Sequence, residues 1–114
     1  MTTLRVPLSE TDIDDHDRVT YRGQPLTGVT VETRPDGSLA SEAHHTDGLQ
    51  DGPERVYWPD QTLKLERVYR RGLPVSERTW HRNGRLAHEM QLKEGGELVS
   101  EQWWDEDGNP IPAP

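Results

Sequence analysis

The chain has 114 residues, a length typical of one domain, and it contains no cysteine. Without thiols it has neither a disulfide framework nor a thiolate zinc site, and no apolar run reaches the length of a membrane span or a signal-peptide core. We therefore expect a soluble, cytoplasmic protein with a thin core, because only 30% of the residues are hydrophobic and the net charge is −8.

The charge is distributed unevenly along the chain. Residues 1–21 carry a net charge of −3, residues 22–93 carry +1, and residues 94–114 hold six acidic residues without a Lys or Arg. Both ends are acidic, while the middle is balanced and contains a stretch rich in arginine. Long-range repulsion from the ends opposes the binding of polyanions, so nucleic acid is not an expected partner.

Residues 1–17 form an acidic N-terminal segment, within which residues 11–17 are predicted to be a solvated acidic loop. Residues 18–21 alternate like a strand, and we expect them to pair with residues 29–33. At the other end of the chain, residues 111–114 are a proline-rich tail. Because proline lacks an N–H, we expect residues 109–114 to fray or to lie extended along the last strand.

An internal repeat organises residues 18–110. The turn positions Gly37, Gln61, Gly84 and Gly108 are separated by 24, 23 and 24 residues, and each of the first three is followed by a glycine eleven residues later. Each unit reads as strand, tight turn, strand and second turn, with units of about 23–47, 48–71, 72–94 and 95–110. Repeated hairpins that contact only their neighbours predict an all-β fold, a single elongated and twisted antiparallel meander.

The clearest hairpin surrounds Asn83 and Gly84. Asn-Gly predicts a type I′ turn, whose positive φ angles at both central positions match the twist of the strands that it joins. Trp80 and Leu86 should then lie near each other across the hairpin. Connecting turns are predicted at Arg22-Gly23, Asp47-Gly48, Arg71-Gly72 and Gly95-Gly96.

Strand alternation predicts which side chains share a face of the sheet. The aromatic and leucine positions of the repeat should share one face: Tyr57, Trp80, Trp104, Leu39, Leu63, Leu86, Tyr69 and Leu92. The recurring glutamates have the opposite parity and should line the other face, with arginines as cross-strand partners. These charged positions are Glu42, Glu54, Glu66, Glu77, Glu89, Glu101, Arg55, Arg67 and Arg78.

No constellation of catalytic residues is present. His44 and His45 are adjacent, so on a strand they point to opposite faces and cannot jointly bind a metal. His81 and His88 flank one turn, but two imidazoles without a carboxylate make a poor metal site. The glutamates recur once in each unit, as structural residues do, whereas an active site is needed once. We expect no enzyme activity, no metal and no cofactor.

The paired aromatic residues need a separate interpretation. Trp103-Trp104 and Tyr57-Trp58 each place one ring on either face of the sheet. If one member of each pair packs in the core, the other is exposed for binding or is covered by neighbouring side chains. Exposed tryptophan is enriched at binding hot spots, and packing against arginine stems is the alternative.

The motif in residues 48–63 resembles a variant MORN (membrane occupation and recognition nexus) repeat. It runs Gly-Leu-Gln-Asp-Gly-Pro-Glu-Arg-Val-Tyr-Trp-Pro-Asp-Gln-Thr-Leu, with two glycines, an aromatic strand, a turn and a leucine. Residues 81–86 and 104–110 match the same pattern, so the resemblance covers roughly residues 18–110. Bacterial arrays of this kind are similar to the YwqK-type antitoxins. That resemblance implies an immunity protein for a polymorphic toxin such as a nuclease or a deaminase.

Together, the resemblance and the charge pattern favour a protein that binds the basic surface of a cognate toxin and occludes it. The expected partner-binding residues are Asp12, Asp14, Asp15, Asp17, Trp58, Glu101, Trp103, Asp105, Glu106 and Asp107. The alternative is a MORN-type scaffold that binds another protein or an anionic membrane surface through the arginine-rich middle. The open edges of the sheet also allow self-association.

Overall fold

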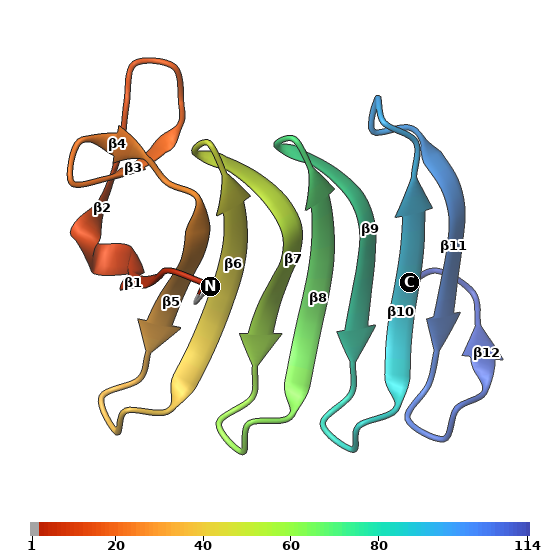
Figure 1. The fold of residues 1–114 in the computed structure, drawn as a ribbon. Helices are drawn as coiled ribbons and strands as arrows, with labels where there is room; N and C mark the ends of the chain where they lie inside the picture. Colours follow the sequence, from red (N-terminus) through yellow and green to blue (C-terminus); the bar gives the residue numbers. More distant parts are fainter. Residues whose placement is uncertain (1–2) are drawn as a thin grey trace.

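The computed structural model describes residues 3–114, which form β-strands joined by short turns (Figure 1). Among these residues the single helical element is the 3₁₀ turn η1 (Leu8–Glu10). The larger sheet has nine strands in the order β1 (Arg5–Pro7), β5 (Gly28–Thr33), β6 (Leu39–Thr46), β7 (Leu49–Tyr57), β8 (Leu63–Arg70), β9 (Leu73–Trp80), β10 (Leu86–Leu92), β11 (Leu98–Trp104) and β12 (Pro110–Ile111). A smaller sheet contains β2 (Thr11–Ile13), β3 (Val19–Tyr21) and β4 (Gln24–Pro25).

The predicted meander is confirmed. From β5 to β12 every strand pairs antiparallel with the next one in the sequence, so the hairpins lie side by side in one layer (Figure 1). The radius of gyration is 15.8 Å, whereas a compact domain of this length would have about 13 Å. The sheet is therefore extended, and both of its broad faces are accessible over much of their area.

The hairpin turns at Gly37, Gln61, Gly84 and Gly108 are three-residue loops that end in a residue with positive φ, rather than type I′ turns. At Asn83-Gly84, the loop is closed by two backbone bonds between His81 N and Arg85 O (2.9 Å) and between Gly84 N and His81 O (3.0 Å). Gly84 has φ +87° and Asn83 is not among the residues with positive φ. The type I′ prediction is therefore wrong here, because the extra loop residue absorbs the strand twist as a bulge. Trp80 and Leu86 are register partners, as expected.

Type I′ geometry lies at the opposite end of the hairpins, in the connecting turns. Asp47 and Gly48 between β6 and β7 have φ of 50° and 83°, and Arg71 and Gly72 between β8 and β9 have φ of 50° and 84°. The connecting turns are therefore where the sequence places them. The turn between β10 and β11 uses the three-residue form instead, with Gly96 at φ 86°.

The predicted division of the sheet into an aromatic face and a glutamate face is wrong. The hydroxyl of Tyr57 donates a hydrogen bond to Glu42, and Arg67 donates one to the hydroxyl of Tyr69, so aromatic and charged residues share each face. Register shifts next to the turns, such as the one between Val56 and Tyr57, change the parity of the strand. A prediction that counts residues across such a bulge puts the side chain on the wrong face.

The N-terminal region also differs from the prediction. Residues 19–21 form β3, which pairs with β2 and β4 in the smaller sheet and not with β5. The outer edge of β5 pairs instead with β1, in parallel. Of the predicted acidic segment 1–17, residues 1 and 2 lie outside the described residues, and residues 11–13 form β2 rather than a loop.

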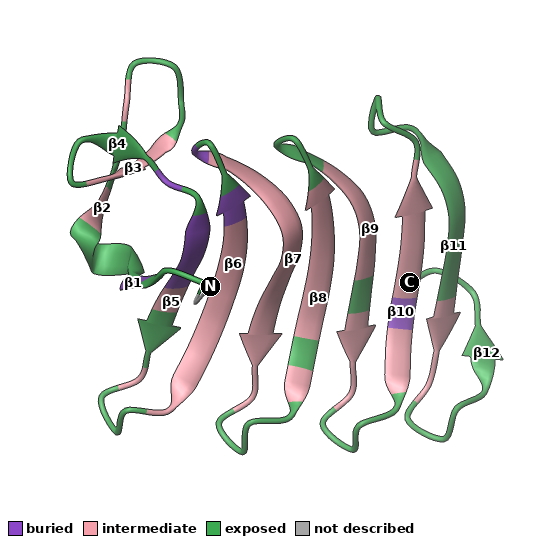
Figure 2. Cartoon of the chain, viewed as in Figure 1, coloured by how far each residue is buried: buried purple, intermediate pink, exposed green. Residues whose placement is uncertain are grey.

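The buried core lies where the smaller sheet meets β5 and β6. Val6, Leu26 and Val29 are each 2% exposed, whereas most residues in the rest of the large sheet are half-buried (Figure 2). Backbone bonds join the two sheets, from Val19 N to Gly48 O (2.9 Å) and from Gly48 N to Leu26 O (2.8 Å). The N-terminal sheet thus closes one end of the meander and supplies its tightest packing.

The beginning of the C-terminal tail lies extended along the last long strand, one of the two arrangements expected. Pro110 and Ile111 form β12 and pair with Trp104 and Trp103. No helix formed by residues 3–114 is long and apolar enough to cross a membrane.

Candidate partner-binding surface

The strand register brings the repeated charges into two rows that cross the sheet on opposite faces. We call them the Arg55 row (Glu42, Arg55, Glu66, Arg78 and Glu89) and the Arg67 row (Glu54, Arg67, Glu77, His88 and Glu101). In the Arg67 row the register partner of Glu77 and Glu101 is Met90, and His88, two residues before it on β10, reaches both glutamates diagonally. Neighbours such as Glu54 and Arg55 are consecutive on one strand, so their side chains point to opposite faces. Opposite charges face each other across strands in both rows, an arrangement that stabilises antiparallel pairs.

In the Arg55 row, Glu42 accepts three partners. Arg5 lies 3.1 Å from its carboxylate, Arg55 lies 3.7 Å away, and the Tyr57 hydroxyl donates a hydrogen bond at 2.8 Å. Burial by itself raises the pKa of Glu42, but the bonds from Tyr57 and Arg5 outweigh it and hold the pKa below its ordinary value. Further along the row, Arg55 pairs with Glu66 (2.9 Å) and Arg78 with Glu89 (2.8 Å).

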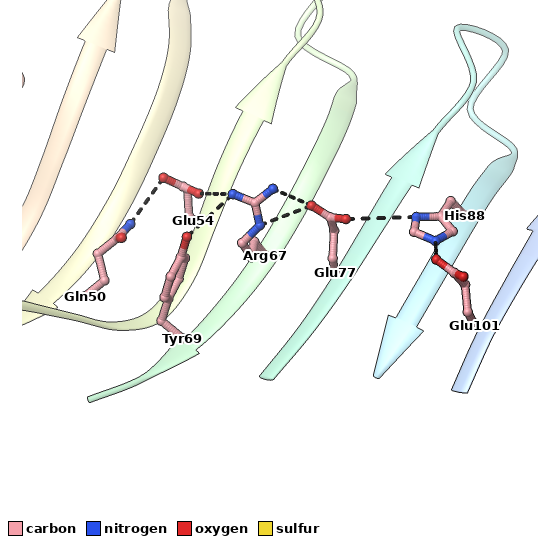
Figure 3. A network of polar contacts seen from close by, with 7 residues as sticks. All are labelled: Gln50, Glu54, Arg67, Tyr69, Glu77, His88 and Glu101. Carbon is pink, nitrogen blue, oxygen red and sulfur yellow. Dashed lines mark hydrogen bonds and ion pairs between the residues drawn. The ribbon is translucent and has the colours of Figure 1, made fainter. Parts of the chain in front are cut away.

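In the Arg67 row, one guanidinium joins two strands (Figure 3). Arg67 bonds Glu77 on β9 and lies 3.5 Å from Glu54 on β7, while its Nη1 lies 3.5 Å from the Tyr69 hydroxyl. Gln50 donates to the other oxygen of Glu54 at 3.2 Å. The hydrogen bond to Tyr69 and the bond to Glu77 raise the pKa of Arg67 above its ordinary value, against the effect of burial.

His88 continues this row, and sequence reasoning missed it. Its Nδ1 lies 4.0 Å from Glu77 and its Nε2 lies 2.7 Å from Glu101 (Figure 3). The imidazole is stacked on the Trp103 indole, with ring centroids 3.8 Å apart. The pairing of β9, β10 and β11 brings these residues together, and no local pattern in the sequence shows it because the register shifts beside His88.

The predicted site residues of the N-terminal end lie on β2 and in the turn after it. Asp12, Asp15 and Asp17 are exposed and have no ion-pair partner among residues 3–114. Asp14 caps the turn, because its carboxylate accepts the backbone N–H groups of His16 (2.8 Å) and Arg18 (2.9 Å). The Arg18 N–H is the main cause that lowers the pKa of Asp14.

The predicted residues of the C-terminal end have two different environments. Glu101 and Trp103 contact His88, so they belong to the Arg67 row. Asp105 caps the last hairpin turn by accepting the N–H groups of Asp107 and Asn109, both at 2.9 Å, and the N–H of Asn109 is the main cause that lowers its pKa. The carboxylates of Glu106 and Asp107, at the tip of the turn, have no ion-pair partner within the described part of the chain.

Trp58 is neither fully exposed nor part of the core. The cations of Lys64 and Arg82 both lie over its indole ring, 4.8 Å and 4.6 Å from the ring centroid. The indole Nε1 is buried and has no hydrogen-bond partner. Cation–π contacts of this kind hold the tryptophan at the surface and stabilise it there.

The structure does not bring all the predicted residues into one site. The N-terminal acids lie beside β5, at one side of the large sheet, and the C-terminal acids lie at the last turn beside β11 and β12, at the other side (Figure 1). Trp58 lies between them, in the turn that joins β7 and β8. Within residues 3–114, no group of three or more His, Asp or Glu side chains is arranged to hold a metal ion. The two acidic ends instead carry unpaired carboxylates that can attract cationic groups.

No protein-family model matches the chain, and no curated protein matches it in sequence. Among solved structures, the chain is similar to one from the crystal structure of accessory secretory protein 1, 2 and 3 in Streptococcus pneumoniae, with a TM-score of 0.46 and 16% identity. The match covers 87% of this chain and 21% of that chain. The resemblance to MORN repeats and YwqK-type antitoxins therefore stays a prediction, and the proposals below rest on geometry and charge.

Proposed function

We propose that this protein is an antitoxin or immunity protein that neutralises a cognate toxin by covering the toxin's basic surface. The observation that supports it is the contrast in charge compensation across the sheet. The middle strands pair their charges in two rows, whereas Asp12, Asp15, Asp17, Glu106 and Asp107 at the two ends have no cationic partner among residues 3–114. Unpaired acids at two sides of an extended sheet suit a protein partner with a broad positive surface.

A nuclease or a nucleic-acid deaminase is the class of toxin that fits this surface best. Such an enzyme needs positive charge around its active site to bind a polyanion. The same positive charge would steer it towards the acidic ends of this chain, and the sheet between them would then block access to the active site. Inhibition in this scheme is steric and electrostatic, and it requires no catalytic group on the inhibitor.

A scaffold that contacts an anionic membrane through the arginine-rich middle is the alternative. The contacts of those arginines give it less support. Arg67 and Arg78 pair with glutamates, Arg82 lies on the Trp58 ring, and Arg85 donates to the Asp107 carbonyl group. Arginines engaged in this way offer fewer free cations to lipid phosphates.

The decisive experiment is co-purification with the product of the adjacent gene, together with protection of cells from that product's toxicity. Binding that weakens steeply as salt rises would support the proposal, because contacts between separated charges are screened. Absence of both binding and protection would refute it.

Matched charge variants locate the contact. The pair Glu106→Gln and Asp107→Asn removes two charges from the C-terminal turn. The pair Asp47→Asn and Asp51→Asn removes one charge from the turn between β6 and β7 and one from β7. We expect the first pair to slow association and the second to change it much less. Equal effects from both pairs would show that only the net charge matters and that the ends are not the contact surface.

A further inference from the structure

The Arg67 row is incomplete on the side of the sheet that faces the N-terminal strands. Glu54 pairs in register with Arg67 on β8 and with Ala43 on β6, so it has a cation on one side and a methyl group on the other. The Arg55 row on the opposite face has no such gap. Its terminal carboxylate, Glu42, receives Arg5 from β1 at 3.1 Å. Residues 3–114 therefore supply the terminal cation for one row and not for the other.

A trough lies where that cation would be. Its lining includes Leu8, Thr30, Ala43, His45, Gln50 and Glu54, and its volume is about 210 Å³. The small side chains of Thr30 and Ala43 are register partners between its two sides. The volume is below the roughly 300–1,000 Å³ of pockets that take drug-sized molecules. The trough therefore suits a single long side chain better than a metabolite.

The polar groups around the trough are acceptors for a cation. Glu54 lies at one end, and Glu32, whose carboxylate accepts the Ser41 hydroxyl at 3.2 Å, lies at the other. His45 is 6% exposed, and its Nδ1 is buried without a hydrogen-bond partner. Burial lowers the pKa of His45 and so favours the neutral ring, and a neutral imidazole has one unprotonated nitrogen that can accept a hydrogen bond.

We propose that this trough binds the cationic side chain of an arginine or lysine on the protein partner, which completes the Arg67 row in trans. The aliphatic stem of that side chain would lie on Leu8 and Ala43, with its head between Glu32 and Glu54. The proposal that a toxin partner carries this side chain rests on the proposed function. The affinity of the trough for a cationic side chain does not.

The site can be tested without the partner. N-acetyl-arginine amide and N-acetyl-lysine amide are titrated separately into the ¹⁵N-labelled protein and followed by NMR. We expect saturable shifts confined to Thr30, Ala43, His45, Gln50 and Glu54, and the stronger ligand identifies the preferred side chain. Glu32→Gln should weaken binding by about two- to fivefold, the size of one exposed charge pair, while the control Glu106→Gln leaves it unchanged. Shifts that are absent, or that spread equally over the acidic ends, would overturn the inference.

A second test supplies the cation from the chain itself. Ala43→Arg should complete the row, so its urea midpoint should exceed that of Ala43→Met, a neutral variant that fills the same trough. Both variants should abolish the titration with the arginine probe. A midpoint for Ala43→Met equal to or above that of Ala43→Arg would show that no cation is missing from the row.

The same variant separates this inference from the proposed function. If the adjacent gene's product binds Ala43→Arg as tightly as the unmodified chain, the trough is not a contact and the antitoxin proposal stands. If that product does not bind the unmodified chain at all, the antitoxin proposal fails and the titration alone decides the trough.

Discussion

Most charged side chains in β6 to β10 lie in cross-strand pairs, whereas the acidic residues of the two ends lie mostly in turns and face solvent. In the middle, Glu66 is 2.9 Å from Arg55 and Glu89 is 2.8 Å from Arg78, so these charges mainly stabilise the sheet. At the ends, Asp12, Asp15, Glu106 and Asp107 have no cation among the described residues. Charges that are already paired contribute little to binding a partner, and unpaired ones remain available for it.

The ends also differ from each other in how they are joined to the middle. The N-terminal sheet is packed against β5 and β6 over the buried side chains of Leu26 and Val29. The C-terminal end continues the meander as a single layer, with Leu98 and Val99 more than half exposed. We therefore expect substitutions at the N-terminal junction to have the largest effect on stability, and substitutions of unpaired acids to have the smallest.

The largest effect should come from Gly48→Ala, which breaks the junction between the end and the middle. A Cβ at Gly48 would lie 2.7 Å from the Arg18 Cβ and 2.9 Å from the Val19 carbonyl oxygen. Gly72→Ala is the matched control, because it has the same turn position and nearly the same φ (84° against 83°) but its nearest neighbour is 3.7 Å away. We expect a loss of about 1 kcal/mol for Gly72→Ala from positive φ, and about 2–4 kcal/mol for Gly48→Ala. Urea unfolding measures both, and equal losses would show that the close contact does not matter.

The next effect should come from Arg67→Met, which breaks the charge compensation of the middle. The substitution leaves the half-buried carboxylates of Glu54 and Glu77 without their shared cation. We expect a loss of about 1–2 kcal/mol, between the values for exposed and buried ion pairs. Arg70→Met on the same strand is the control, since its pair with Glu94 is 3.9 Å long and both side chains are mostly exposed. A loss below about 0.5 kcal/mol for Arg67→Met would mean that the row stabilises nothing beyond what a surface pair does.

The sequence predicts the middle better than the ends. The period of 23–24 residues requires repeated hairpins, and repeated hairpins in sequence order require a meander, so the middle of the fold follows from spacing alone. The smaller sheet has no repeat to reveal it, and its position depends on a long-range contact between Gly48 and residues 18 and 19. No pattern within residues 1–21 contains that information.

The two charged rows show which features can be predicted from the alternation of side chains along a strand and which cannot. Cross-strand pairing of glutamate with arginine is predictable from the repeat, and the structure contains it. Which face of the sheet each side chain occupies is not predictable in this way. A bulge of one residue beside each turn moves every following side chain to the other face. The contact between His88 and Glu101 depends on the same register, so it too required the structure.

A smaller effect should appear at acidic pH and should involve the two turn caps that lie among the predicted site residues. The backbone N–H groups that bond Asp14 and Asp105 lower both pKa values below the ordinary 3.8. A depressed pKa in the folded state gives stability that is complete above the unfolded value and is lost as the pH falls through the folded value. The double variant Asp14→Asn and Asp105→Asn keeps a neutral acceptor at both caps but cannot titrate.

The measurement is the urea midpoint between pH 2 and pH 7. We expect the double variant to be less stable than the unmodified chain above about pH 5, to lose less stability below about pH 4, and to converge with the unmodified chain at the acid end. The control is Asp12→Asn with Asp15→Asn, which removes the same charge from positions that cap nothing. The control variant could reduce the fall in urea midpoint at acidic pH as much as the cap variant does. In that case general charge repulsion, and not protonation of the caps, explains the loss of stability.

The smallest effect on stability should come from removing the unpaired acids, and it is the sharpest test of the comparison between middle and ends. The variant with Asp12→Asn, Asp15→Asn, Glu106→Gln and Asp107→Asn loses four charges that have no ion-pair partner in residues 3–114. Because nearby like charges repel one another, we expect its free energy of unfolding to equal or slightly exceed that of the unmodified chain, within about 0.5 kcal/mol. Association with a basic partner should nevertheless slow markedly at low salt and much less at high salt, since steering by separated charges is screened. A variant that loses stability would show that these acids serve the fold, and a variant that keeps its association rate at every salt concentration would show that they do not serve binding.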